Sequence, residues 1–163
     1  MKTVLILRHA KSSWSNPGLA DIDRPLNKRG KQDAPRMGAL LDEKDLVPDL
    51  ILSSPARRAR KTAQAVSVHC SYGGEIETVP DFYPGDAYTF INTLMALPDE
   101  DKNVMIVAHN PGMEELLFAL AGESARMPTS ALAQVSLPID TWQELDDEVE
   151  GVLENLWRVK ELG

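Results

Sequence analysis

Two histidines and an arginine stand at the ends of two short apolar segments of this chain. Val4–Leu7 runs directly into Arg8 and His9, and residues 104–108 run into His109. Aliphatic runs of this length predict strands that are covered on both faces, as in parallel sheets. Ligands bind at the carboxyl edge of such sheets, so we expect Arg8, His9 and His109 to meet there. A guanidinium group beside imidazoles favours a phosphate ligand.

Two further junctions are typical of helix N-termini that hold an anion. Ser54 follows the expected strand 49–53, whose centre is apolar, and precedes a proline, and Asn110 also precedes a proline. These residues are expected as N-caps, with proline as the first helical residue, and free N–H groups at such ends attract phosphate. Each junction alone is more often an ordinary helix start. Their coincidence with the histidines and with the pair Arg57 and Arg58 indicates a phosphate pocket.

The three histidines of the chain are isolated from one another in the sequence. His9, His69 and His109 lack the ligand spacing of a zinc site, so we expect no metal and no other cofactor. His69 is expected on a helix, away from the site. A neutral imidazole is a capable nucleophile that can accept a phosphoryl group, which water would then release. Arg8, Arg58 and His109 would stabilise the negative charge of the transferred group.

The elements that must position these residues alternate between strand and helix. Strands are expected at 3–8, 49–53, 76–79 and 103–108, with helices at about 28–43, after Arg58, at 86–97 and at 112–121. Two edge strands, 131–137 and 152–159, are expected to bracket an acidic loop or helix at 142–150. This alternation predicts one domain, residues 1–163, with a mainly parallel sheet and helices on both faces.

Charge and composition exclude several classes of function. The net charge is −8, but residues 1–61 carry +6 and residues 62–163 carry −14. A local anion site on an acidic protein fits this division, whereas nucleic-acid binding would need a sustained basic face. Cys70 is the only cysteine, so no internal disulfide is possible, and no segment is typical of a signal peptide or membrane span. We therefore expect a cytoplasmic protein that contacts no membrane.

Four separated segments resemble the histidine phosphatase superfamily, and within it the small phosphohistidine phosphatases of the SixA type. They are Leu7–Trp14; Asp23–Leu26 with Gly30, Asp33 and Ala34; Ser53–Pro55 with Arg58, Ala59, Thr62 and Ala63; and Val107–Gly112. The resemblance covers residues 1 to about 122. It implies an α/β fold, a phosphoglycerate mutase-like three-layer α/β/α sandwich whose mainly parallel sheet has an antiparallel edge strand. It also implies that His9 becomes phosphorylated and that Arg8, Arg58 and His109 surround the phosphate.

The chain departs from the superfamily pattern at two points. Ala10 stands where relatives usually carry glycine, which indicates a negative φ or less need for space. The glutamate that protonates an alkoxide leaving group in larger relatives is missing, and only Asp81 or Asp86 could replace it. Asp86 is better explained as a helix N-cap. A phosphoramidate needs less acid catalysis than an ester, so the missing glutamate favours a phosphohistidine substrate.

The loop after His9 admits two interpretations. Trp14 and its neighbouring serines either close a hydrophobic edge and form turns, or they border the pocket with Ser15 or Asn16 donating to phosphate.

The leading hypothesis is a metal-independent phosphatase that hydrolyses phosphohistidine on a protein through a phospho-His9 intermediate. A phosphomonoesterase of broad specificity for small phosphorylated molecules and a non-catalytic phosphate-binding module are the alternatives. A monomer is slightly favoured over an oligomer.

Overall fold

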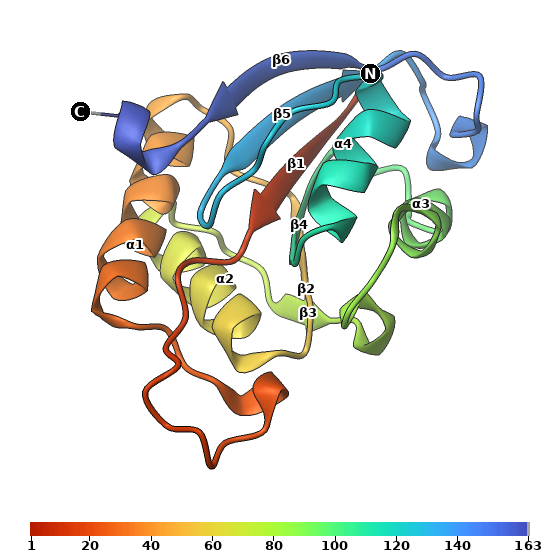
Figure 1. The fold of residues 1–163 in the computed structure, drawn as a ribbon. Coiled ribbons are helices and arrows are strands. Elements are labelled where there is room, and N and C mark those ends of the chain that lie inside the picture. Colours follow the sequence, from red (N-terminus) through yellow and green to blue (C-terminus); the bar gives the residue numbers. More distant parts are fainter. Residues whose placement is uncertain (163) are drawn as a thin grey trace.

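The computed structural model describes residues 1–162, which form a six-stranded sheet with two helices on each face (Figure 1). The strands are β1 (Lys2–Arg8), β2 (Leu50–Ser53), β3 (Ile76–Thr78), β4 (Asn103–Ala108), β5 (Leu132–Leu137) and β6 (Val152–Trp157). The helices are α1 (Lys28–Glu43), α2 (Arg57–His69), α3 (Ala87–Met95) and α4 (Gly112–Ala121). The strand order is β3-β2-β4-β1-β5-β6.

The sheet is mainly parallel, as the sequence predicts. β4 lies between β1 and β2 and is parallel to both, and β3 is parallel to β2. β5 is antiparallel to both β1 and β6, so the antiparallel strand lies one position inside the edge that β6 forms. The acidic stretch 142–150 is a loop that contains one short 3₁₀ turn, Trp142–Glu144.

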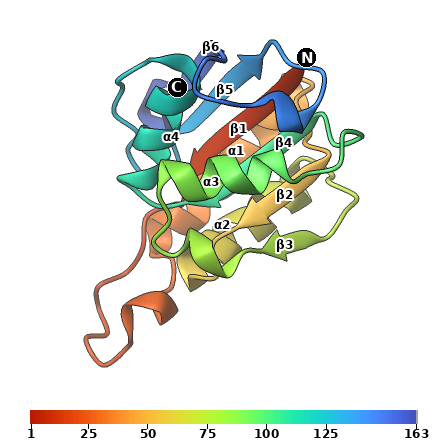
Figure 2. The same ribbon diagram turned by 90° about the vertical axis from the view of Figure 1, so that its right-hand side faces the viewer.

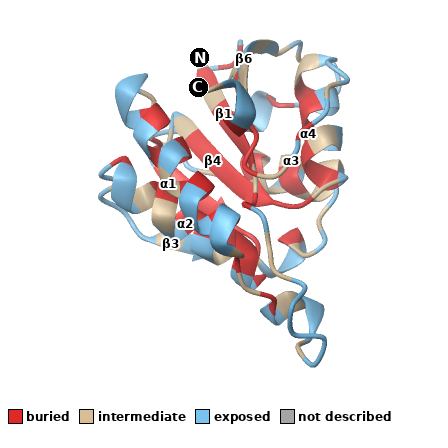
Figure 3. Ribbon diagram, turned by 60° about the vertical axis from the view of Figure 1, so that its left-hand side comes forward, coloured by how far each residue is buried: buried red, intermediate tan, exposed pale blue. Residues whose placement is uncertain are grey.

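The alternation of side chains along β1 divides the core into two clusters. Val4 and Ile6 pack with residues of α3 and α4, whereas Leu5 and Leu7 pack with residues of α1 and α2. All four side chains are fully buried. Figure 2 shows α3 lying across the sheet, and in Figure 3 the buried strands separate the α1–α2 pair from the α3–α4 pair. The three-layer α/β/α sandwich follows from this alternation.

Two expected helix starts are wrong, because the capping side chains bind elsewhere. α2 begins after Ala56 without a side-chain cap, since the Ser54 hydroxyl contacts His109. α4 begins after Pro111, and the Asn110 amide donates to Glu114 instead of capping the helix. Both side chains therefore belong to a network around the strand ends.

Gly30 allows the chain after His9 to cross the first turn of α1. A Cβ atom at Gly30 would lie 2.1 Å from the carbonyl oxygen of Lys11. We expect Gly30→Ala to lower the free energy of unfolding by about 3 kcal/mol, because backbone must move to admit the methyl group. Urea unfolding measures this loss, and Gly73→Ala is the matched control, since its added Cβ would meet nothing within 4 Å. Equal stability of the two variants would contradict the prediction.

None of the helices within residues 1–162 combines the length and the apolar character that crossing a bilayer requires.

Candidate active site

His9 and His109 lie side by side because they follow neighbouring parallel strands. Arg8, the last residue of β1, is in register with Ala108, the last residue of β4. The ladder continues one step further, since the backbone N–H of His9 donates to the carbonyl oxygen of Ala108 at 3.0 Å. The two imidazole rings are tilted, with their centroids 5.0 Å apart. Backbone hydrogen bonds thus set the separation of the histidines.

The hydrogen bonds of His9 determine which ring nitrogen is free. Nδ1 lies 2.7 Å from the carbonyl oxygen of Ala10, which can only accept, so Nδ1 carries the proton. Nε2 is therefore the unprotonated nitrogen. Ala10 itself is fixed by Thr62, whose hydroxyl accepts from the Ala10 N–H at 2.9 Å and donates to the carbonyl of Arg58 at 2.7 Å. One threonine thus ties the chain after His9 to the first turn of α2.

Ser54 determines the tautomer of His109. The Ser54 hydroxyl accepts from the N–H of Ala56 at 3.1 Å and lies 2.7 Å from Nε2 of His109. Its own hydrogen has no other acceptor within residues 1–162, so the hydroxyl donates to Nε2. The proton of His109 is then on Nδ1, which is buried without a partner. His109 thus presents an unused N–H donor.

Arg8 and Arg58 add two further unused donors. Their Nε atoms are buried and have no hydrogen-bond partner. Arg8 is held from one side by the carbonyl of Met127 at 3.2 Å, and Arg58 donates to the carbonyl and carboxylate of Asp21 at 2.8 and 3.1 Å. Buried donors without acceptors are costly unless a ligand completes them.

These side chains surround a cavity of about 320 Å³ at the carboxyl end of the parallel strands. Its lining residues are Arg8, His9, Lys11, Ser12, Trp14, Arg24, Arg58, His109, Asn110 and Thr129. Four of these side chains are cations and none is an acid, so the cavity is suited to a small anion with more than one negative charge, such as phosphate. Among residues 1–162, no group of three or more His, Cys, Asp or Glu side chains is arranged to hold a metal ion.

Comparison with known proteins identifies the family. Residues 4–83 match the histidine phosphatase superfamily (branch 1). A putative phosphohistidine phosphatase SixA from Agrobacterium tumefaciens is 33% identical, with a TM-score of 0.83 over 96% of this chain and 97% of that chain. The chain belongs to the histidine phosphatase superfamily.

A second SixA structure and a sequence relative of undescribed function extend the comparison. A protein histidine phosphatase SixA complexed with tungstate has a TM-score of 0.85 and 26% identity over 99% of both chains. An uncharacterised chloroplastic protein of Arabidopsis thaliana is 31% identical over 153 residues, which are 88% of this chain and 70% of that protein. The SixA-type fold predicted from the four motifs is confirmed, and the family match with the two SixA likenesses supports phosphatase activity.

Ala10, the departure from the superfamily pattern, fits without strain. Its φ is negative, so glycine is not required there, and its methyl group is buried against Leu26 and Ala34. The site therefore accommodates alanine at this position by packing it.

Several residues that the sequence proposes for the site lie outside the cavity. Ser15 and Asn16 are exposed and bond within their own loop, to Ser13 and to the N–H of Gly18. Asp81 is exposed, and Asp86 caps α3 by accepting from the N–H of Thr89 at 2.9 Å.

Asn110 does line the cavity, but not as a donor to a ligand. Its amide donates to Glu114 at 2.9 Å and to the carbonyl of Met127 at 2.9 Å. Glu114 also accepts from the N–H of Met127 at 2.8 Å, so this network holds the chain segment that contacts Arg8. Asn110 is therefore placed as a positioning residue.

Asp21, Arg24 and Tyr83 are site neighbours that the sequence reading missed. Asp21 accepts from the hydroxyl of Tyr83 at 2.5 Å and from Arg24 at 3.0 Å, besides Arg58. These hydrogen bonds, that of Tyr83 foremost, hold the pKa of Asp21 well below its usual range. Asp21 is therefore ionised and is not a general acid. The motif at residues 23–26 could have indicated this cluster, because an arginine that becomes buried needs an acidic partner.

Trp14 borders the cavity, as one interpretation of its loop predicts, whereas Ser13 and Ser15 bond to each other within the loop, as the other predicts. The Trp14 side chain is 76% exposed, and the guanidinium carbon of Arg24 lies 3.5 Å from its ring centroid. It therefore forms a stacked wall of the entrance instead of closing a hydrophobic edge.

Both histidines are neutral at neutral pH. Burial, reinforced by nearby positive groups, lowers the pKa of His9 to about 3 and that of His109 to about 4. In the unfolded chain both return to about 6.5. The unfolded state therefore binds more protons as the pH falls below 6.5, and stability present above this pH is lost progressively toward the lower pKa values.

We expect the free energy of unfolding to fall by at most about 2 kcal/mol per histidine between pH 6.5 and pH 5. Urea unfolding at the two pH values measures the loss, and His109→Gln should reduce the difference. If the free energy of unfolding of His109→Gln depended on pH as that of the unchanged protein does, this would contradict the neutral state of His109.

Proposed function

We propose that this protein is a metal-independent phosphatase that hydrolyses phosphohistidine on a protein, through a phosphorylated His9. One observation carries the proposal: His9, whose Nε2 is unprotonated, lines one cavity together with Arg8, Arg58 and His109, and each of these three has a buried donor without a partner. Phosphoryl transfer requires a nucleophile that is surrounded by fixed hydrogen-bond donors.

The reaction has two displacement steps. Nε2 of His9 attacks phosphorus and forms an N–P bond, while the bond between phosphorus and the substrate imidazole breaks and that imidazole takes up a proton. Water then attacks phospho-His9, which releases inorganic phosphate and regenerates the imidazole. In both steps Arg8, Arg58 and His109 donate to the phosphoryl oxygens. Because these donors are positioned before the substrate arrives, little reorganisation is needed.

The identity of the lining side chains supports a phosphoramidate over an alkyl ester. No carboxyl group lines the cavity, and Asp21 at its border is held ionised by Tyr83 and the arginines. An alkoxide leaving group needs an acid at this place, whereas an imidazole can be protonated before it leaves. The names of the two SixA relatives agree with this substrate class.

A direct comparison of substrates tests the proposal. The purified protein would be incubated in EDTA with a histidine-phosphorylated protein, an aryl phosphate and an alkyl phosphate, and phosphate release would be followed. We expect kcat/KM to be highest for phosphohistidine and lowest for the alkyl ester. Faster turnover of the alkyl ester would instead identify a small-molecule phosphomonoesterase, and dependence on an added metal would contradict the mechanism.

A further inference from the structure

The catalytic cavity opens onto a larger positively charged surface. A second cavity, of about 600 Å³, shares Arg8 with it and is lined further out by Arg126, Arg158 and Lys160. A third, smaller cavity shares Lys160 with the second and Lys11 with the first. The residues that line these three adjoining cavities are called the cationic face below.

The cationic face has the opposite charge to the rest of the protein. Eight of the 17 Lys and Arg residues line it, but only three of the 25 Asp and Glu residues do. It therefore carries +5 and the remainder of the chain −13, and counting Asp21 at its border leaves +4. A separation of this size creates a directional field around the molecule.

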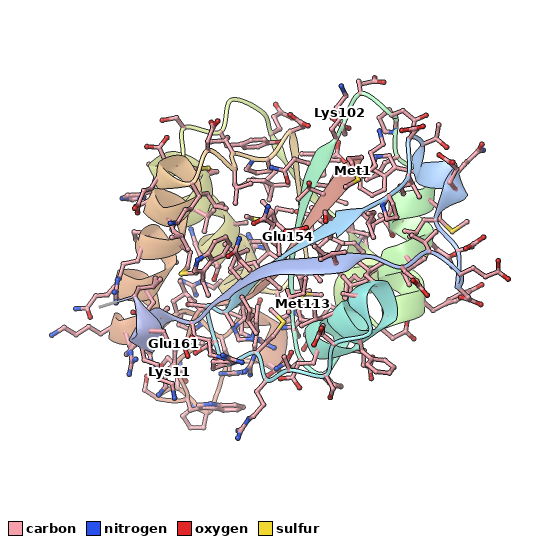
Figure 4. All side chains as sticks on the ribbon, turned by 90° about the horizontal axis from the view of Figure 1, so that it is seen from above. Met1, Lys11, Lys102, Met113, Glu154 and Glu161 are labelled. Carbon is pink, nitrogen blue, oxygen red and sulfur yellow. The ribbon has the colours of Figure 1, made fainter. Side chains whose placement is uncertain are left out.

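The cationic face does not simply reflect a part of the sequence that is rich in Lys and Arg. Residues 62–163 contain only four Lys and Arg residues against 18 Asp and Glu residues. Three of these four, Arg126, Arg158 and Lys160, lie on the cationic face. The fourth, Lys102, precedes β4 at the opposite end of the sheet, as Figure 4 shows by its distance from Lys11 and Glu161.

The cations of this face are available to a partner. Within residues 1–162, Lys11, Arg126 and Lys160 form no ion pair, and all three are exposed. Arg158 is fixed by two hydrogen bonds to the carbonyl of Arg126, at 2.9 and 3.2 Å, with Glu161 at 3.6 Å. Uncompensated charges at the rim of a site give specificity and speed of association more than affinity.

We propose that the cationic face docks an acidic surface of the protein that carries the phosphoryl group. This inference rests on the proposed function, and it names the chemistry of the partner around its phosphohistidine. The phosphate itself is satisfied inside the first cavity by Arg8, Arg58 and His109, so the cations outside it are left for other anions. The acidic remainder of the chain repels the same partner, which favours approach with the catalytic cavity in front.

Peptide binding tests the proposal independently of turnover. Two fluorescent peptides are phosphorylated on a central histidine with phosphoramidate; Asp and Glu flank it in one, and Asn and Gln replace them in the other. Their Kd values are measured by anisotropy with His9→Ala, which cannot hydrolyse them. We expect the acidic peptide to bind about tenfold more tightly, and added salt to remove the difference.

Variants of exposed cations identify the face responsible. In the His9→Ala background, Arg126→Glu with Lys160→Glu should abolish the preference for the acidic peptide, whereas Lys102→Glu should retain it. No preference, or a preference that survives the double substitution, would overturn the proposal. The proposal would also be overturned if the double substitution weakened the binding of a carboxyphenyl phosphate as much as that of the acidic peptide. The face would then serve a small substrate.

Turnover by the protein with His9 intact is recorded separately. Failure to hydrolyse either peptide would refute the phosphohistidine substrate, while the Kd values would still decide the docking surface.

Discussion

Replacing His9 with alanine is expected to lower kcat by about 10⁴-fold or more on every phosphorylated substrate, because no other side chain can form the covalent intermediate. His109 cannot substitute for it. Its Nε2 is occupied by Ser54 and its Nδ1 carries the proton. The loss should appear equally in kcat and kcat/KM, since the N–P bond forms only after the substrate is bound.

The intermediate itself provides the decisive measurement. Rapid mixing with a ³²P-labelled substrate, followed by denaturation, should trap a phosphoprotein that is labile to acid and stable to alkali, as phosphoramidates are. His9→Ala should show no label, and His69→Ala, which changes the exposed histidine on α2, should show the full amount. Label that persists in His9→Ala would refute the nucleophile assignment.

Arg58→Ala is expected to lower kcat/KM by about 10²- to 10³-fold, because it removes a donor aimed at developing charge. Its neighbour Arg57 is exposed and absent from the cavity lining, so Arg57→Ala is the matched control with the same change in charge and helix propensity. Steady-state kinetics on an aryl phosphate measures both. Arg58→Ala also removes two of the hydrogen bonds that Asp21 accepts, so thermal unfolding is recorded to separate lost catalysis from lost structure.

Equal activity of the two arginine variants would contradict the role of Arg58. Recovery of part of the activity in Arg58→Lys would support it, since a point charge replaces some of the attraction but not the planar fork.

The central histidines were predictable because the strand pattern carries the information. Val4–Leu7 and residues 104–108 are recognisable as buried strands, and parallel neighbours bring their ends together through backbone hydrogen bonds alone. The residues after such strands are therefore located without knowledge of side-chain contacts. The same reasoning placed the pair Arg57 and Arg58 near this edge, since they begin α2, the helix after β2, and the family resemblance selected Arg58.

Residues in the long loop could not be located in this way. Asp21 reaches Arg58 and Tyr83, which are 37 and 62 positions away, and no periodic pattern encodes such contacts. The same limit explains the wrong expectations for Ser15 and Asn16, which are exposed in that loop. Ser54 was misassigned as a cap because its competing partner, His109, is distant in sequence.

The continuation of the backbone ladder to His9 separates chemistry from recognition in this chain. His9 and His109 directly follow core strands, so a substitution that moves their backbone must disturb the centre of the sheet. Trp14 and Arg126 belong to exposed segments between elements, where changes cost little stability. Descendants of such a protein can therefore diverge in the partners they serve while they retain one reaction.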